Sequence, residues 1–271
     1  ASADFSTNIN SYQSSVNENR YTTGLFFEVD KEYFMGTILS FSSRFDSISD
    51  FENQISSRIG ISHDGYRASY SQGYRLPTLY EMYGIDSYGY QGNANLKSED
   101  IDSYEVGYRR GNFDTALFYI EESNAITYSN SSYVNVAEGG ESKGAEVSYS
   151  RSILGYDLAS NVTYTEAKLN NGNEKLRRPT WVNNSSISKN INDLNYKVSM
   201  NYYGDHKDID SSTFQTIDKD SITTFDLELN QIMENKMFYL GLYNITDEKY
   251  EQPDGYNQLG INFQAGIRIT M

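Results

Sequence analysis

The sequence of 271 residues contains no Cys, only 3 Pro and a single Trp. Without Cys, the chain cannot use disulfides or thiolates for stability, catalysis or metal binding. No segment approaches the roughly 18 consecutive apolar residues that a membrane-spanning helix requires, which excludes a helical membrane protein. Residues 1–4 lack the basic start and apolar run of a secretory signal peptide, so we expect a processed or truncated product.

Basic residues are few relative to acidic ones. The chain has 22 Lys and Arg against 37 Asp and Glu, which gives a formal net charge of -15 at pH 7. Nucleic acids are bound mainly through their phosphates, so this balance argues against a nucleic-acid partner. The acidic excess is compatible with loops that meet cationic or metal-bearing ligands, but a contribution to solubility alone is the interpretation that we favour.

Tyrosine is the most informative residue type that the chain does contain. The sequence has 25 Tyr and an aromatic fraction of 14%, with a mean hydropathy of -0.64. This combination is unusual for a protein with an ordinary dry core. It is typical of a membrane β-barrel, in which one face of each strand meets lipid, the other meets water, and aromatic girdles lie at both interfaces.

Apolar and polar residues alternate with a period of two in many segments. In the last segment the apolar set is Ile261, Phe263, Ala265, Ile267, Ile269 and Met271, and polar residues or Gly lie between them. The same alternation recurs in residues 156–165, 195–202 and 225–230. A helix would scatter these residues around its circumference, whereas a strand sorts them onto two faces. These segments are therefore predicted to be β-strands.

Short and long connections between the predicted strands also alternate. Short turns are predicted at residues 30–32, 62–64, 110–112, 153–155, 191–193 and 233–236. Longer polar links are predicted at residues 46–50, 76–99, 128–133, 169–176, 204–220 and 247–258. Short turns on one side and long loops on the other are typical of outer-membrane barrels, whose long loops lie outside the cell. This count gives about fourteen strands, the first near residues 5–12.

A soluble β-sandwich or β-helix is the alternative to a barrel. A sandwich would place a face rich in Val, Leu and Ile against a dry core, but here one face is rich in Tyr, Gly and Ala, and the other in Asn, Ser, Thr and Glu. A water-filled or plugged lumen accounts better for the polar face. We therefore predict an all-β, antiparallel transmembrane β-barrel as a single domain over residues 1–271, with these charged side chains facing the lumen: Glu105, Glu146, Arg109, Arg178 and Arg268.

Several motifs in order along the chain resemble those of one family. Residues 73–84 read GYRLPTLYEMYG, residues 92–99 read GNANLKSE, and residues 103–108 read SYEVGY. An RRP segment at residues 177–179 and YNITDEKY at residues 243–250 follow. Together they resemble the C-terminal half of TonB-dependent receptors, although Ala94 and Ser98 stand where that pattern has Pro.

The resemblance implies a nutrient importer of the Gram-negative outer membrane. The barrels of this family have about twenty-two strands around a plug, so this chain would be the C-terminal portion of a longer receptor, with the plug absent. The partners implied are outer-membrane lipid, the TonB system acting through that plug, and a small-molecule nutrient. Residues 176–178 and 254–260 look most like those of vitamin B12 (cobalamin) receptors, with ferric siderophore or haem receptors as the alternative.

The expected ligand contacts are Tyr and Asn side chains in the long loops. Tyr offers a rigid apolar face with a polar end at low entropic cost, which suits a corrinoid or a siderophore. The alternative interpretation is that some of these Tyr belong to the aromatic girdle, and that residues 254–256 form an ordinary turn. The candidate residues are Tyr80, Tyr83, Tyr88, Tyr90, Asn93, Asn95, Tyr128, Tyr133 and Tyr256.

The sequence does not indicate an enzyme, a cofactor or a metal centre. The two His, His63 and His206, lie far apart, and no nucleophile elbow or phosphate-binding loop stands out. His206 with Asp205, Asp208 and Asp210 could hold calcium, but a solvated acidic loop is the interpretation that we favour. Two other functional classes stay open: a passive channel closed by about fourteen strands, and an assembly partner whose open edges pair with another chain, since open edges cannot persist in lipid.

Overall fold

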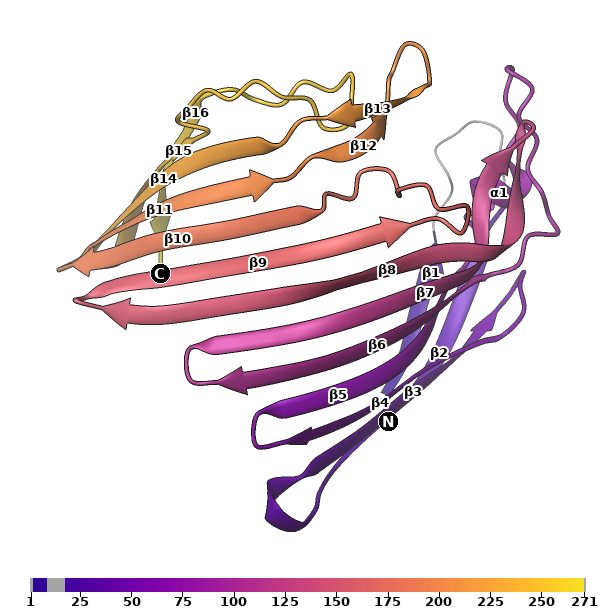
Figure 1. The fold of residues 1–271 in the computed structure, drawn as a ribbon, viewed down its shortest axis with the longest axis horizontal. Coiled ribbons are helices and arrows are strands. Elements are labelled where there is room, and N and C mark those ends of the chain that lie inside the picture. The colour runs from indigo at the N-terminus through magenta and orange to yellow at the C-terminus, as the bar shows by residue number, and fades with distance from the viewer. Residues whose placement is uncertain (1, 9–17, 271) are drawn as a thin grey trace. The chain divides into compact units, whose positions relative to one another are not determined.

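The computed structural model describes residues 2–8 and 18–270. Fourteen strands form one sheet in which each strand is hydrogen-bonded to the next one along the chain, and a separate two-stranded sheet joins β12 to β13 (Figure 1). The strands of the large sheet are β1 (Ser2–Asn8), β2 (Arg20–Glu32), β3 (Ile38–Ile48), β4 (Gln54–His63), β5 (Tyr66–Arg75), β6 (Glu99–Arg110), β7 (Phe113–Ser129), β8 (Ser132–Ile153), β9 (Tyr156–Lys168), β10 (Trp181–Ile191), β11 (Leu194–Tyr203), β14 (Ile222–Met233), β15 (Lys236–Tyr243) and β16 (Asn262–Ile269). The prediction of an all-β antiparallel fold with about fourteen strands is confirmed.

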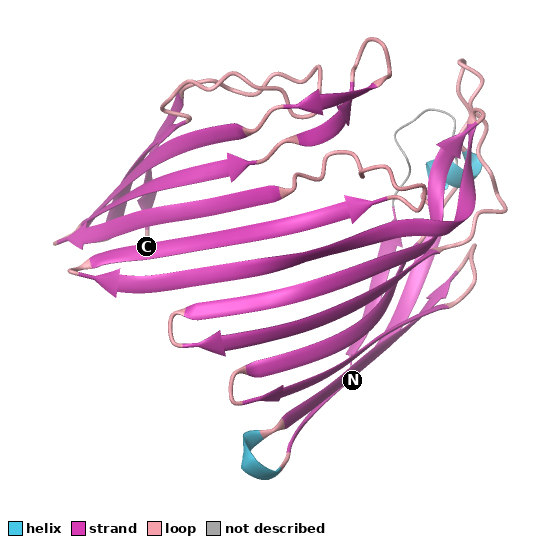
Figure 2. Ribbon diagram, in the orientation of Figure 1, coloured by secondary structure: helices cyan, strands magenta, loops and turns pink. Residues whose placement is uncertain are grey.

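Helical structure is confined to two short segments in the described residues, α1 (Leu79–Tyr83) and the 3-10 turn η1 (Phe34–Gly36), drawn in cyan in Figure 2. Neither these nor any other part of residues 2–8 and 18–270 forms a helix long and apolar enough to cross a membrane.

The chain divides into two compact units. Unit 1 comprises Ala1–Tyr108, Phe118–Lys143 and Lys168–Asn173, and unit 2 comprises Arg109–Leu117, Gly144–Ala167 and Glu174–Met271. Each unit is a single layer of strands with its own loops, so the side chains of each strand point alternately to two faces.

In both units one of these faces carries large exposed apolar side chains. In unit 1, Leu25 and Phe27 of β2 and Ile59 of β4 are all more than half exposed, at 62%, 53% and 56%. In unit 2, Phe263 and Ile267 of β16 are 74% and 59% exposed. A soluble protein would bury such a continuous set, so this face is suited to an apolar surrounding.

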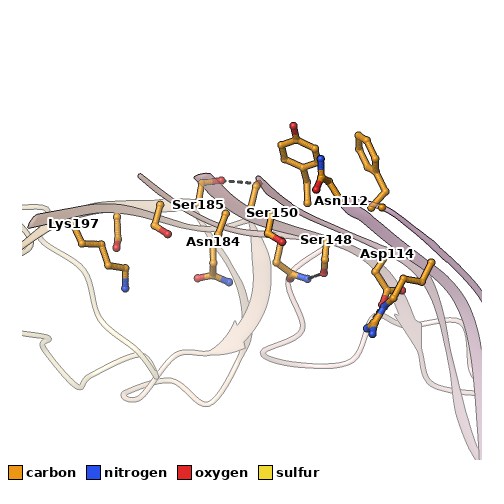
Figure 3. Close-up of a pocket in the computed structure, with 16 residues that line it drawn as sticks. Asn112, Asp114, Ser148, Ser150, Asn184, Ser185 and Lys197 are labelled. Carbon is orange, nitrogen blue, oxygen red and sulfur yellow. Dashed lines mark hydrogen bonds and ion pairs between the residues drawn. The ribbon is translucent and has the colours of Figure 1, made fainter. Parts of the chain in front are cut away.

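The opposite face is polar. In unit 2 it forms a groove of about 580 Å³ lined by Ser, Asn and charged side chains. Figure 3 shows Ser185 on one side of the strands and Asn184, Ser148 and Lys197 on the other. In unit 1, Arg67 Nε on β5 lies 2.9 Å from Glu105 Oε1 on β6.

Of the five charged residues expected on the lumen side, four lie in strands and one lies in a link. Glu105, Glu146 and Arg268 alternate along their strands with exposed apolar neighbours such as Val106, Val147 and Ile267, and Arg109 is paired with Asp114. Arg178 lies in the link between β9 and β10, outside the strands, so it is not part of the alternation between the two faces.

Most of the predicted short turns are confirmed. β4 and β5 are joined through Asp64 and Gly65, with φ of 45° and 83°, the left-handed pair that a two-residue hairpin needs. Similar two-residue connections end at Asn112, Gly155, Asp193 and Asn235. At such positions Gly adopts positive φ without a steric penalty from Cβ.

Two predicted connections were wrong. Residues 30–32 are the end of β2, and the turn follows at residues 33–37, where Tyr33 N donates to Thr37 O at 2.7 Å. Asp30 and Glu32 lie on the polar face of this strand, and Lys31 lies between them on the other face with Val29, so the polarity of residues 30–32 does not mark a turn. The predicted long link at residues 128–133 is a two-residue turn at Asn130 and Ser131, both at positive φ.

Three further segments differ from expectation. The first strand, predicted near residues 5–12, is β1, which pairs with β2 and ends at Asn8; residues 9–12 and Met271 lie outside the described residues. The link at residues 204–220 contains the hairpin of β12 (His206–Ile209) and β13 (Thr216–Lys219), which the sequence did not predict. The link at residues 46–50 begins later, because β3 extends to Ile48.

Candidate functional site

The long loop of unit 1, residues 76–98, begins with a capped turn of helix. Thr78 Oγ1 accepts from Glu81 N at 3.1 Å, and Glu81 Oε2 accepts from Thr78 N at 2.6 Å, which is a capping box. The T-x-x-E spacing in the sequence is the local signal for this arrangement. It fixes α1 directly after Pro77, which is fully buried.

Arg20, at the start of β2, anchors this helical turn to its neighbour strand. Its side chain is 3% exposed, and Nη1 donates to Pro77 O at 2.6 Å. Nε and Nη2 donate to the Asp50 carboxylate at 2.9 and 3.0 Å. One guanidinium therefore joins three segments that are distant in sequence, and nothing in the sequence around Arg20 indicated this role.

The two ends of the same loop are joined by a second ion pair. Arg75, the last residue of β5, is in register with Glu99, the first residue of β6. Arg75 Nη2 donates to Glu99 Oε1 at 2.8 Å, and Nη1 lies 3.3 Å from Glu81 Oε2. Opposite charges at the two ends of a loop between antiparallel strands, here Arg75 and Glu99, could have predicted this ion pair from the sequence.

The GNANLKSE segment turns back against α1 at close range. Gly92 N donates to Gly84 O at 2.7 Å, and a Cβ on Gly92 would lie 2.6 Å from the Met82 carbonyl, so only Gly fits. Asn93 Nδ2 donates to Tyr133 O at 3.0 Å, and its Oδ1 accepts from Asn95 N.

One departure from the family pattern has a visible consequence. Ser98, which stands where the pattern has Pro, donates its hydroxyl to Gln54 Oε1 at 3.3 Å.

Four of the predicted tyrosines come together in one cluster. The rings of Tyr80 and Tyr90 are stacked with centroids 4.6 Å apart, and Tyr133 meets Tyr90 edge-on at 5.8 Å and Tyr128 at 5.3 Å. Tyr90 is only 4% exposed, and its hydroxyl donates to Tyr80 O at 2.8 Å. Burial raises the pKa of Tyr90 to about 12. Tyr90 therefore forms the centre of the loop's own small core.

The remaining candidates, and Tyr128 of the cluster, differ in accessibility. Tyr88 is 94% exposed and Tyr128 is 57% exposed, while Tyr83 is half-buried. Asn95 is exposed at the turn that Asn93 caps. Tyr256 belongs to unit 2, where it is 67% exposed. The structure thus separates tyrosines that hold the loop from tyrosines that a ligand could touch.

The loops of unit 2 meet at Asp208. This side chain is 1% exposed and accepts from Arg177 Nε at 2.6 Å, Ile209 N at 2.8 Å and Asp254 N at 2.9 Å. Burial alone would raise the pKa of Asp208, but the hydrogen bonds from Asp254 and Arg177 hold it below its usual value. For Asp208 the expectation of a solvated acidic loop was wrong, because this carboxylate is buried and accepts from cationic and backbone donors, whereas Asp205 is exposed.

Asp254 makes the reciprocal contact from the β15–β16 link to the β12–β13 hairpin. Its carboxylate accepts from Ser211 N and Lys219 Nζ, each at 2.9 Å. These two donors lower the pKa of Asp254 to about 2. Gly255 follows at φ 82°, and a Cβ there would lie 2.7 Å from Ser211 Oγ, so the tip that carries Tyr256 packs on the hairpin.

The base of the same link is tied by Asn244 of the YNITDEKY motif. Asn244 is 5% exposed, and its Nδ2 donates to Glu248 O at 2.9 Å and Leu259 O at 3.2 Å. Asp247 Oδ1 accepts from Ile261 N at 2.8 Å. The Asn and Asp of this motif therefore shape the loop.

His, Cys, Asp and Glu side chains do not gather into a group of three that could hold a metal ion within residues 2–8 and 18–270. The Asp208 carboxylate accepts a hydrogen bond from Arg177 Nε, and the Asp210 carboxylate accepts from Ser212 N and Thr213 N.

A family model described as TonB-dependent receptor-like, β-barrel, matches residues 1–245. The chain belongs to the TonB-dependent receptor β-barrel family. Members of this family are receptors and transporters of the Gram-negative outer membrane and are not enzymes. The resemblance that the sequence motifs suggested is confirmed.

Among curated proteins, the chain is 26% identical over 255 residues to the vitamin B12 transporter BtuB of Vibrio cholerae serotype O1. That match covers 88% of this chain and 40% of the transporter, so the chain spans less than half the length of this relative.

Solved receptors share the fold at lower identity. A ferric enterobactin receptor (PfeA) variant from Pseudomonas aeruginosa has a TM-score of 0.73 and 19% identity, covering 92% of this chain and 45% of that one. The siderophore receptor PirA from Acinetobacter baumannii has a TM-score of 0.74 and 16% identity, covering 94% of this chain and 47% of that one. For this TonB-dependent receptor barrel, these neighbours establish the fold alone.

The Arg20 anchor predicts a specific loss of order. Arg20→Met removes the charge that pairs with Asp50 and leaves Pro77 O without its donor, which should destabilise this region by about 3 kcal/mol. Limited proteolysis should then cut residues 76–98 faster. Arg58→Met, at an exposed arginine on β4, should leave the cleavage rate unchanged; equal rates in both variants would contradict the anchoring role.

The lowered pKa of Asp254 predicts an acid-stable contact between loop and hairpin. Because the folded value, about 2, lies below the ordinary 3.8, the stabilisation is fully present above about pH 4 and is lost as the pH falls towards 2. Pepsin, which is active in this range, should cut residues 244–261 progressively faster from pH 4 to pH 2. In Asp254→Asn the cut should be fast throughout, and a wild-type loop cut equally fast at pH 4 would refute this assignment.

Proposed function

We propose that this chain forms the barrel wall and part of the ligand-recognition surface of an outer-membrane receptor for TonB-dependent nutrient uptake, with a cobalamin-like ligand. The observation that carries the proposal is the 26% identity to a vitamin B12 transporter over 88% of the chain. The agreement of residues 176–178 and 254–260 with cobalamin-receptor motifs supports it. Residues 1–271 act in this proposal as a single barrel-forming domain.

The chemistry of the loops fits a large amphipathic ligand. Tyr88, Tyr128 and Tyr256 are exposed aromatic side chains on loops or hairpin ends whose bases are fixed by ion pairs and caps. A rigid aromatic surface loses little entropy on binding, so it contributes affinity that a flexible loop would lose. Tyr80, Tyr90, Tyr133 and Asn93 are assigned to holding that surface, with Tyr83 and Asn95 at its margin.

In this proposal, transport also requires a plug domain and the TonB system. The loops capture the nutrient, a plug inside the barrel contacts it, and force from the TonB system rearranges the plug. The polar face of the strands borders the lumen, and the apolar face meets outer-membrane lipid. A lumen that is filled by water or by a plug explains why the polar face carries so many hydroxyl and amide groups, because these groups can hydrogen-bond to water or to protein.

Ligand titration of the receptor purified in detergent from its native outer membrane tests the proposal. Cyanocobalamin should bind, while ferric enterobactin and haemin should not. Binding of ferric enterobactin alone would reject cobalamin and establish the siderophore alternative. If none of these ligands bound and the protein conducted ions steadily in planar bilayers, it would be a passive channel.

The exposed tyrosines should contribute to affinity and the distant ones should not. Tyr88→Ala and Tyr128→Ala should each weaken cyanocobalamin binding about ten-fold, the loss of roughly 1.4 kcal/mol expected of an aromatic contact. Tyr66→Ala is the matched control, since Tyr66 is 61% exposed at the opposite end of β5. Equal affinities in all three variants would remove these tyrosines from the binding surface.

The membrane setting predicts that the two faces of β11 respond differently to charge. Val198 lies on the apolar face at mid-strand and is 40% exposed, and Ser199 beside it lines the polar groove. Val198→Arg should destabilise the protein by about 2–4 kcal/mol in lipid vesicles, and Ser199→Arg by less than about 1 kcal/mol. Urea unfolding in vesicles measures both, and equal costs would contradict this placement of the faces.

A further inference from the structure

Asp208 joins three loop segments that are far apart in sequence. Arg177 lies 31 residues before it and Asp254 lies 46 residues after it, and both donate to its carboxylate. Arg177 is held in turn by the hairpin, because its backbone N donates to Lys207 O at 2.7 Å. Tyr203 Oη donates to Arg177 O at 3.1 Å. One buried carboxylate thus fixes the β9–β10 link, the β12–β13 hairpin and the β15–β16 link together.

Two of these three segments, the hairpin and the β15–β16 link, carry exposed aromatic side chains at their tips. Tyr256 is two residues beyond Asp254 and is 67% exposed, and Phe214, at the tip of the hairpin, is 78% exposed. Asp208 itself is 1% exposed and cannot contact a ligand. Asp208 can therefore affect ligand recognition only indirectly, by fixing the position of Tyr256.

Lys219 makes the arrangement reciprocal. It donates to Asp254 Oδ1 at 2.9 Å and lies 3.6 Å from Glu251 Oε2, while Glu251 accepts from Gly255 N at 2.9 Å. The β15–β16 link therefore accepts a hydrogen bond from Lys219 of the hairpin and donates one, from Asp254 N, to Asp208 of the hairpin. Such paired charge-assisted hydrogen bonds are short and directional, so they define one relative position of the two segments.

We infer that Asp208 is a positioning residue that holds Tyr256 in its ligand-binding place, although it touches no ligand itself. This inference rests on the proposed function. The surface so arranged presents aromatic side chains from two segments, Phe214 on the hairpin and Tyr256 on the link. It suits the apolar face of a large amphipathic nutrient.

A double-mutant cycle with cyanocobalamin as the probe tests the inference in the receptor purified from its outer membrane. In the wild type, Tyr256→Ala should weaken binding about ten-fold. In Asp208→Ala, binding is already weakened, and adding Tyr256→Ala should change it less than about two-fold. Asp218→Asn is the matched control on the same hairpin, because Asp218 is 81% exposed; there the ten-fold cost of Tyr256→Ala should persist. Independent, additive losses in the Asp208→Ala background would overturn the positioning role.

Hydrogen exchange without ligand separates this inference from the proposed function. Asp208→Ala should raise exchange in residues 174–180, 206–219 and 252–258 together, and Asp218→Asn should not. A change confined to the hairpin would overturn the inference whether or not the receptor binds cyanocobalamin. If Asp208→Ala fails to fold, Arg177→Met removes one donor at a half-exposed side chain and should show the same three-segment change at smaller amplitude. If Asp208→Ala shows the change in all three segments but the wild type does not bind cyanocobalamin, the proposed ligand is rejected and the positioning role stands.

Discussion

The hydrogen bonds of the strand ladder are the constraint on which the rest of the structure depends. Each inner strand of the large sheet pairs its backbone groups with two neighbouring strands, while β1 and β16 are the two ends of the strand order. Neither face is covered by another layer within a unit, so the side chains meet two surroundings, one apolar and one polar. In a membrane, such a ladder leaves the backbone groups of the inner strands paired without water.

A single layer has no shared hydrophobic core, and the protein's buried apolar residues show where packing occurs instead. Of the described residues, Leu79, Met82, Tyr90 and Leu96 are all less than 9% exposed, and all four belong to the loop between β5 and β6. This loop therefore carries its own core, enclosed by the Arg20 and Arg75 ion pairs. The loops of unit 2 reach a comparable order by polar means, through Asp208, Asp254 and Asn244. Order of either kind reduces the entropy lost when a ligand binds.

Much of the fold and part of the site could be predicted from the sequence. The period-two alternation located the strands because each strand separates apolar from polar side chains, and the predicted turns at residues 110–112 and 153–155 contain Gly111 and Gly155, both at positive φ. Prediction failed where polar residues lay on the polar face of a strand, as at Asp30, or where a link folded into its own hairpin, as with β12 and β13. The roles of Arg20 and Asp208 in joining loops could not be predicted, because Pro77 O and Asp254 N lie 57 and 46 residues away, a separation at which local patterns carry no information.

The central claim is that alternate residues of each strand face lipid and the lumen. The 271 residues contain no Cys, so, once any Cys outside them is replaced, a nitroxide can be attached to single Cys introduced along β16 of the receptor in vesicles. Collisions with oxygen, which concentrates in lipid, should peak at 263, 265, 267 and 269, and collisions with a water-soluble nickel complex at 262, 264, 266 and 268. A profile without this period of two, or with the two phases exchanged, would contradict the account.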